Sequence, residues 1–155
     1  MVSPLFFPGG DIGALAVHGT VNDLAMMGAT PLALTVAYII EEGFPLNDLR
    51  RIVTSVGRAA TAAGVPVVAG DTKVVPRGAA DGIFLTTSGI GRRLPGARVS
   101  AAFARPGDSV LISGPIGAHG GTVVPTHPSR VHLRTLLGSS RIVTMLLGEQ
   151  LPRIC

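Results

Sequence analysis

Hydrophobic and polar positions change their spacing from segment to segment, and this spacing predicts the first elements of the chain. Residues 2–7 form a short apolar run that stops at Pro8-Gly9-Gly10, which is typical of a strand followed by a turn. Asp11 then stands where its carboxylate can accept the free N–H groups of a first helical turn. We therefore predict a helix that runs to about Met27 and ends at Gly28.

The next two segments predict a buried strand and an amphipathic helix. Residues 31–40 are apolar at nearly every position, which is typical of a strand covered on both faces. In the helix that follows, apolar residues recur at steps of three and four, and Gly64 ends the pattern. The apolar stripe consists of Leu46, Leu49, Val53, Val56, Ala60 and Ala63.

Short apolar segments later in the chain predict three further strands. Residues 65–69 form the first and lead into the segment 70–75, and residues 83–90 alternate well enough to form the second. Residues 109–113 form the third, after a turn at 105–108. The order is strand, helix, strand, helix, strand, strand, strand, so we predict an α/β or α+β fold with helices packed on one sheet.

The pattern is lost after Gly121, and this loss divides the chain into three parts. Residues 1–123 are expected to form the folded domain, and residues 124–138 an irregular segment without a clear period. Residues 139–155 are expected to form an amphipathic helix and a free tail, because Ser139 and Ser140 can cap a helix and Pro152 ends it.

Composition excludes several classes of protein. Of the 155 residues, 46% are hydrophobic and 14% charged, which favours one packed domain over a disordered chain. The net charge is +4, but the basic residues are scattered and only 4% of residues are aromatic. Nucleic-acid binding is therefore not expected. Residues 24–40 contain no charge, but a turn signal at 28–31 interrupts them, so two buried elements are expected there and not a membrane span.

The single cysteine, Cys155, excludes an internal disulfide framework and a metal site built on several cysteines. A reducing, cytoplasmic setting fits this composition, and no secretory signal is visible at Met1. As the last residue, Cys155 lies at a chain end, where a thiol could travel between sites. The alternative is an incidental terminal residue.

Two acidic positions are candidates for chemistry. Asp23 follows Asn22 late in an apolar helix, and Asp71 follows a short strand. Ligands collect beyond the carboxyl ends of strands in open α/β sheets, so two carboxylates that converge there could hold Mg²⁺. Lys73, the only lysine, could contact a phosphate or move a proton. The alternative is a turn aspartate and a solvated helix aspartate, and spacing alone favours it.

The remaining polar motifs are weaker. The four histidines, His18, His119, His127 and His132, show no ligand spacing, so a metal site built on histidine is not expected. Residues 114–120 are rich in glycine and could cradle an anion with backbone N–H groups, but such a bend is more often a turn.

Five segments together resemble the HypE family of hydrogenase maturation proteins, which are carbamoyl dehydratases of the aminoimidazole ribonucleotide synthetase (PurM-like) superfamily. The resemblance covers roughly residues 2–121 and 139–155 and includes an ordered series of motifs. These are Phe6–Gly13, Gly19–Ala29, Gly70–Gly78, Ser113–Gly117 and the terminal Pro152–Cys155. Selenophosphate or thiamine-phosphate kinases of the superfamily are disfavoured because they do not end in Pro-Arg-Ile-Cys.

The resemblance implies a reaction on the terminal thiol. The carbamoyltransferase HypF would place a carbamoyl group on Cys155, ATP would activate the amide oxygen by phosphoryl transfer, and elimination would yield a thiocyanate. The cyanide would then pass to iron in the HypC–HypD scaffold complex that builds the [NiFe]-hydrogenase centre. Asp23 and Asp71 match positions that hold Mg²⁺ against the ATP phosphates, and Asn22, Thr72 and Lys73 fall in the same motifs.

The resemblance also implies a PurM N-terminal-like domain, a mixed β-sheet with helices packed on one face, that forms a homodimer through its sheet. Family members run to about twice this length by the general two-domain plan. The segment before Met1 and most of the second domain, between Gly121 and Ser139, are expected to be missing. The alternative function is a catalytically impaired fragment that dimerises or binds maturation partners without ATP turnover.

Overall fold

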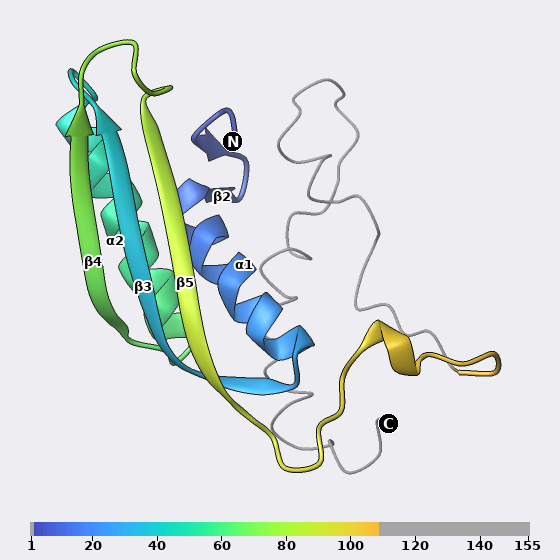
Figure 1. Cartoon of the computed structure of the whole chain (residues 1–155). Helices are drawn as coiled ribbons and strands as arrows, with labels where there is room; N and C mark the ends of the chain where they lie inside the picture. Colours follow the sequence, from blue (N-terminus) through green and yellow to red (C-terminus); the bar gives the residue numbers. More distant parts are fainter. Residues whose placement is uncertain (1, 109–155) are drawn as a thin grey trace.

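The computed structural model describes residues 2–108, which form a three-stranded sheet with two helices on one of its faces (Figure 1). The sheet has the order β4-β3-β5, so β3, the first of its three strands along the chain, is central. It pairs in parallel with β4 and antiparallel with β5. The strands are β3 (Ala29–Glu41), β4 (Val67–Val75) and β5 (Ile83–Arg93). This arrangement confirms the prediction of a mixed sheet with helices on one face.

The first helix, α1 (Ile12–Met26), begins where the sequence predicts it. Asp11 is the N-cap, and its Oδ1 accepts hydrogen bonds from the backbone N–H groups of Gly13 at 2.8 Å and Ala14 at 3.0 Å. The chain leaves the helix through Gly28, whose φ of 67° lies in the left-handed region that favours glycine. The predicted cap and stop of this helix are therefore confirmed.

The strand predicted over residues 2–7 is much shorter in the structure. Only β1 (Phe6–Phe7) is extended, and it pairs antiparallel with β2 (Gly10–Asp11) in a small hairpin ahead of α1. The predicted turn at Pro8-Gly9-Gly10 connects these two strands, and Gly9 adopts a φ of 89°.

The second helix, α2 (Leu46–Ala62), has the predicted bounds but buries a different face. Leu46 and Val53 were expected in the buried stripe, but they are 59% and 47% exposed. The buried residues are Ile52, Val56, Ala59 and Ala60. Ile52 precedes Val53 by about 100° of helical rotation, so a stripe through Ile52 turns Val53 toward solvent.

The helices and the sheet enclose two adjoining clusters of buried side chains. The larger one lies where α1, α2 and the central strand meet, and the smaller one lies near the carboxyl end of β3. The larger cluster comprises Val17, Val21, Leu34, Val36, Val56, Ala59, Ala60 and Val65, and the smaller one comprises Ile12, Ile40, Ile52 and Ile83.

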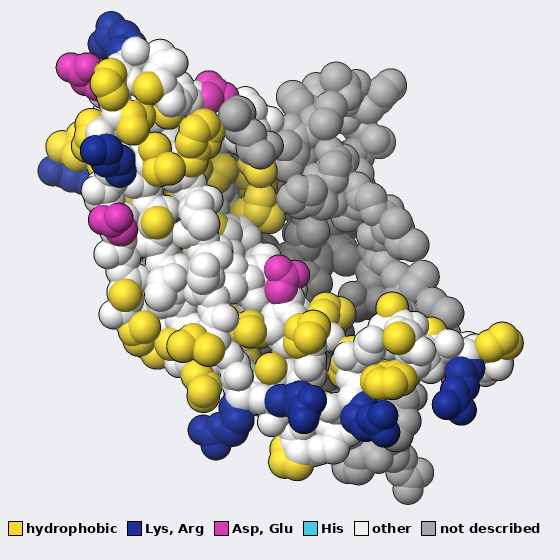
Figure 2. Space-filling model, viewed as in Figure 1, with side chains coloured by type: hydrophobic (Ala, Val, Ile, Leu, Met, Phe, Trp, Pro, Cys, Tyr) yellow, Lys and Arg dark blue, Asp and Glu magenta, His cyan; other side chains and the backbone are white. Residues whose placement is uncertain are grey.

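The prediction that the strand over residues 31–40 is covered on both faces is wrong for the described residues. Leu34, Val36 and Ile40 lie under the helices, whereas Leu32, Thr35 and Ile39 are exposed. We call the side of the sheet away from the helices the open face. Figure 2 views this face, and much of its centre consists of small or uncharged polar side chains and backbone.

The edge strand β4 is longer and more exposed than predicted. It was expected over residues 65–69, but it extends to Val75, so residues 70–75 form part of the strand itself. Every residue from Val67 to Val74 is exposed, because α1 contacts β3 and β5 and neither buried cluster contains a residue of β4. Within residues 2–108, the outer edge of β4 has no partner strand.

Residues 94–108, which follow β5, contain no further strand. Strand β5 itself runs three residues beyond its predicted end at Ile90, and a single 3-10 turn, Ala101–Phe103, follows it. The turn predicted at 105–108 is confirmed, since the Asp108 N–H donates to the Arg105 carbonyl at 3.1 Å. The strand predicted at 109–113 lies outside the described residues. Neither α1 nor α2 is long and apolar enough to cross a membrane.

Candidate functional site

The segment Asp71-Thr72-Lys73 lies within β4, where its side chains alternate between the two faces of the sheet. Asp71, Thr72 and Lys73 pair with Ala37, Tyr38 and Ile39 of β3. Tyr38 packs against the core, so Thr72 lies on the helix side, and the side chains of Asp71 and Lys73 lie on the open face. Asp71 Oδ1 accepts the Thr72 N–H at 2.8 Å. This bond occupies one carboxylate oxygen and leaves the other available to a ligand.

Asn22 and Asp23 lie in the penultimate turn of α1, and their side chains differ in exposure. Asp23 is exposed, whereas the Oδ1 atom of Asn22 is buried and has no hydrogen-bond partner among the described residues. One turn earlier, His18 Nδ1 is also buried without such a partner. Burial lowers the pKa of His18, which favours its neutral form. Among residues 2–108, this face of α1 therefore carries two buried polar atoms without a hydrogen-bond partner.

The structure does not bring Asp23 and Asp71 together within the described part of one chain. Helix α1 packs on β5 and β3, whereas β4 lies on the far side of β3. Asp71 lies in the middle of β4 and not at a strand end, where the sequence had placed it. Residues 2–108 contain no group of three or more His, Cys, Asp or Glu side chains that could hold a metal ion. The assignment of the two carboxylates as metal ligands stays a prediction.

One charged residue near the site was not identified from the sequence. Glu41 ends β3, and its carboxylate accepts the backbone N–H groups of Gly78 and Gly82, the latter at 2.9 Å. Hydrogen bonds from Gly78 and Gly82, helped by the charge of Arg77, lower the pKa of Glu41. The sequence signal for it is an acidic pair, Glu41-Glu42, directly after an apolar strand. Such a pair by itself indicates only the end of the apolar run.

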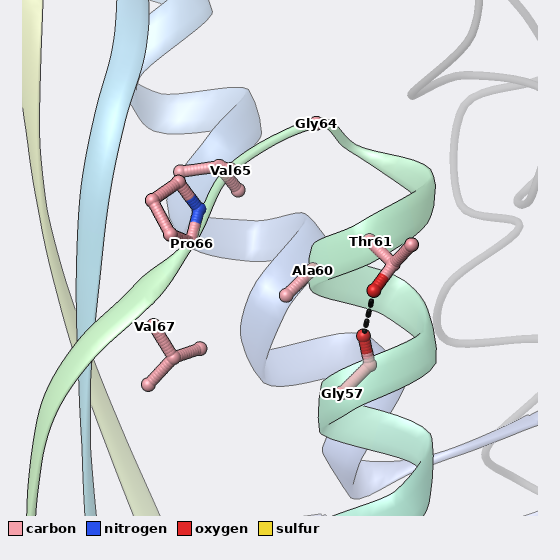
Figure 3. Close-up of a pocket in the computed structure, with 7 residues that line it drawn as sticks. All are labelled: Gly57, Ala60, Thr61, Gly64, Val65, Pro66 and Val67. Atoms are coloured by element: carbon pink, nitrogen blue, oxygen red, sulfur yellow. Dashed lines mark hydrogen bonds between the residues drawn. The ribbon is translucent and has the colours of Figure 1, made fainter.

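Two hollows in the described region are lined by none of the candidate site residues. One of about 370 Å³ lies between the end of α2 and the start of β4 (Figure 3). The Thr61 hydroxyl in its wall donates to the Gly57 carbonyl at 2.9 Å, and no ionisable side chain lines it. The other, of about 560 Å³, lies between the N-terminal segment, α1 and β5, with Asp81 as its only charged lining residue. The first hollow therefore offers no charge for a phosphate or metal ion.

Several candidates from the sequence lie outside the described residues. These include Cys155 and the glycine-rich bend at 114–120. The irregular segment 124–138 and the helix predicted from Ser139 also belong to this group. Their expected roles, and the division of the chain at residues 123 and 138, stay predictions.

Comparison with known proteins identifies the relatives of this chain. Residues 1–93 match the family described as AIR synthase related protein, N-terminal domain. Carbamoyl dehydratase HypE of Azotobacter vinelandii is 61% identical over 124 residues, which cover 80% of this chain and 36% of the relative. The chain thus spans a little over a third of the length of that curated relative.

Solved structures show the same likeness in the fold. The structure of a HypE–HypF complex contains a chain with 65% identity and a TM-score of 0.77, matched over 79% of this chain and 40% of that one. A structure of the hydrogenase maturation protein HypE in complex with ATP matches with 57% identity and a TM-score of 0.75, over 79% of this chain and 36% of that one.

Proposed function

Because the chain belongs to the AIR synthase related protein family, and within it to the HypE carbamoyl dehydratases, we propose that it binds ATP and serves [NiFe]-hydrogenase maturation. The observation that carries this proposal is the 61% identity to a carbamoyl dehydratase over 124 residues. A related HypE chain has a structure in complex with ATP, which supports ATP as the nucleotide.

The proposed reaction takes place on the thiol of Cys155. A carbamoyltransferase of the HypF type transfers a carbamoyl group to the sulfur, and the structure of a HypE–HypF complex supports this partner. ATP then phosphorylates the amide oxygen, which converts a poor leaving group into a good one. Loss of phosphate and of the two nitrogen-bound protons leaves a thiocyanate, with ADP and phosphate as the other products. The cyanide passes to iron in a HypC–HypD scaffold, in a reducing, cytoplasmic setting whose reductant supplies the two electrons that cleave the S–C bond and restore the Cys155 thiolate.

The described residues support separate roles in ATP binding. Within residues 2–108, β3 lies between β4, which carries Asp71, and β5, on which α1 packs, so no step here depends on Asp23 and Asp71 sharing an ion. Asp71 offers one free carboxylate oxygen on the open face, and Lys73 offers an ammonium group on the same face for a phosphate or a proton. Thr72 follows Asp71 in the strand, and Asn22 supplies a buried acceptor beside Asp23.

Titration calorimetry with ATP and Mg²⁺ tests this proposal. We expect saturable binding by the purified chain and at least a tenfold loss of affinity in Asp23→Asn and in Asp71→Asn, about 1.4 kcal/mol, because each change removes a carboxylate charge from a motif to which we assign ATP binding. Asp48→Asn is the matched control, since Asp48 is paired with Arg51 at 3.2 Å on α2 and should leave binding unchanged.

Absence of binding by a folded wild-type chain would contradict the enzyme assignment. It would favour the alternative, a fragment that dimerises or binds maturation partners without ATP turnover.

We further propose that two copies of the chain pair through their sheets. The unpaired outer edge of β4 and its exposed valines support this, because an open edge strand is a template for pairing with another chain. Val68, which is 61% exposed, is the test position. We expect the wild type to sediment as a dimer and Val68→Lys as a monomer, because a buried, unpaired ammonium opposes association. Val53→Lys on α2 should leave the dimer intact, and a dimeric Val68→Lys variant would contradict this pairing.

A further inference from the structure

Glu41 holds the loop that connects β4 to β5. Each oxygen of its carboxylate accepts one backbone N–H group, from Gly78 and from Gly82. Both glycines belong to the segment 76–82, which immediately follows the candidate residues of β4. One side chain therefore fixes two points of this loop against the end of the central strand.

Main-chain hydrogen bonds hold the two ends of the same loop. The Glu42 N–H donates to the Val75 carbonyl at 2.9 Å, and the Glu41 N–H donates to the Gly82 carbonyl at 2.8 Å. The Gly78 N–H, which has the Glu41 carboxylate as its acceptor, lies between these anchors. The conformation around Gly78, and with it the direction of Arg77, therefore depends on the Glu41 side chain.

Arg77 lies across the end of β3. A Cβ atom added to Gly43 would lie 2.9 Å from the Arg77 Nη2 atom, so the guanidinium lies beside Gly43, just after the end of β3. Arg77 is exposed, and neither it nor Lys73 forms an ion pair with another described residue. Since Lys73 pairs with Ile39, two positions before Glu41, both cations belong to the same end of the sheet.

This arrangement suits a polyanionic ligand. Lys73 forms no ion pair with another described residue, and the acidic group that Arg77 acts on, Glu41, already has both oxygens bonded to backbone N–H groups. A guanidinium matches the geometry of a phosphate group, and it binds more tightly when its loop is held in place before the ligand arrives.

We propose that Glu41 is a positioning residue of the ATP site, which holds the 76–82 loop so that Arg77 contacts the β- or γ-phosphate of ATP beside Lys73. This inference rests on the proposed binding of ATP. It adds two residues, Glu41 and Arg77, to those that the sequence identified.

A double-mutant cycle tests the inference, with ATP affinity measured by calorimetry in the presence of Mg²⁺. Gln has the shape of Glu but lacks its charge and has only one acceptor oxygen, so Glu41→Gln can accept only one of the two N–H groups. We expect about a tenfold loss of affinity in Glu41→Gln and a similar or larger loss in Arg77→Gln. The double variant should bind no more weakly than Arg77→Gln, because Glu41 acts through Arg77. Glu42→Gln, a change of the neighbouring exposed carboxylate, is the control and should match the wild type.

Two further readouts separate positioning from a general loss of structure. Amide hydrogen exchange at Gly78 and Gly82 should become faster in Glu41→Gln without nucleotide, whereas exchange in the helices should not change. The loss of affinity should also be larger for ATP than for AMP, because the contact is to a phosphate group that AMP lacks. An equal loss for both nucleotides would overturn the inference.

The outcomes distinguish this inference from the proposed function. Independent, additive losses in the double variant, or unchanged ATP affinity in Glu41→Gln or in Arg77→Gln, would overturn the role of Glu41 and leave ATP binding intact. A folded wild-type chain that binds no ATP would overturn both.

Discussion

Replacing Leu34 with alanine is expected to lower the free energy of unfolding by about 3 kcal/mol. Leu34 lies in the central strand, is completely buried and belongs to the larger core cluster. Truncation removes apolar contacts and leaves a cavity that the flanking strands and helices cannot close without moving. Chemical denaturation followed by circular dichroism measures the change.

Leu32→Ala is the control in the same strand. Leu32 is 45% exposed at a register irregularity in β3, so the same truncation should cost no more than about 1 kcal/mol. Equal losses in the two variants would contradict the assignment of the buried face of β3.

Alanine at position 13 is expected to lower the free energy of unfolding by about 2 kcal/mol, although alanine is the better helix former. A Cβ atom on Gly13 would lie 2.6 Å from the Ile52 carbonyl oxygen and 3.2 Å from Val56 Cγ2. A main-chain oxygen cannot rotate away as a side chain can, so α1 and α2 would have to separate. Thermal and chemical unfolding of the variant measure this cost.

Gly19→Ala, in the same helix, is expected to change the free energy of unfolding in the opposite direction. No atom lies within 4 Å of a Cβ added at Gly19, so the better helix former should raise the free energy of unfolding by about 0.5–1 kcal/mol. If Gly13→Ala stabilised the chain as Gly19→Ala is expected to, the close approach of α1 to α2 would be wrong.

Elements with local signals could be predicted from the sequence. The Asp11 cap satisfies N–H groups only two and three residues away, and Gly28 ends its helix by its own backbone conformation. Both signals are complete within a few residues of the chain, so they could be recognised without knowledge of the fold. The bounds of α2 follow from the same kind of signal at Gly64.

Features that depend on distant partners were predicted less well. The buried face of α2 depends on where α1 and the sheet lie. Periodicity alone therefore could not show that Ile52 is buried and Val53 exposed. The length of β4 depends on its pairing with β3, which continues as far as Glu41 and Val75. The run at 31–40 is apolar enough for two covered faces, but the described residues supply helices on one only.

The same distinction applies to the candidate site. Asp71 and Lys73 were found because they stand in a short contiguous motif. Glu41 was missed as a site residue because its partners, Gly78 and Gly82, lie far along the chain and are brought close only by the sheet. Asp23 and Asp71 are expected from the sequence to converge. Within residues 2–108 of one chain, however, α1 contacts β5 and β3, and β4, which carries Asp71, lies on the other side of β3.

The position of β3 also determines how the domain forms during synthesis. Because the central strand precedes both neighbours in the chain, a nascent chain on the ribosome exposes both edges of β3 until β4 has emerged. The edge of β3 that pairs with β5 stays open longer, because its first residue, Ala29, pairs with Arg93, the last residue of β5. A chain released before β5 is complete therefore keeps an open edge on its most buried strand, where it can aggregate.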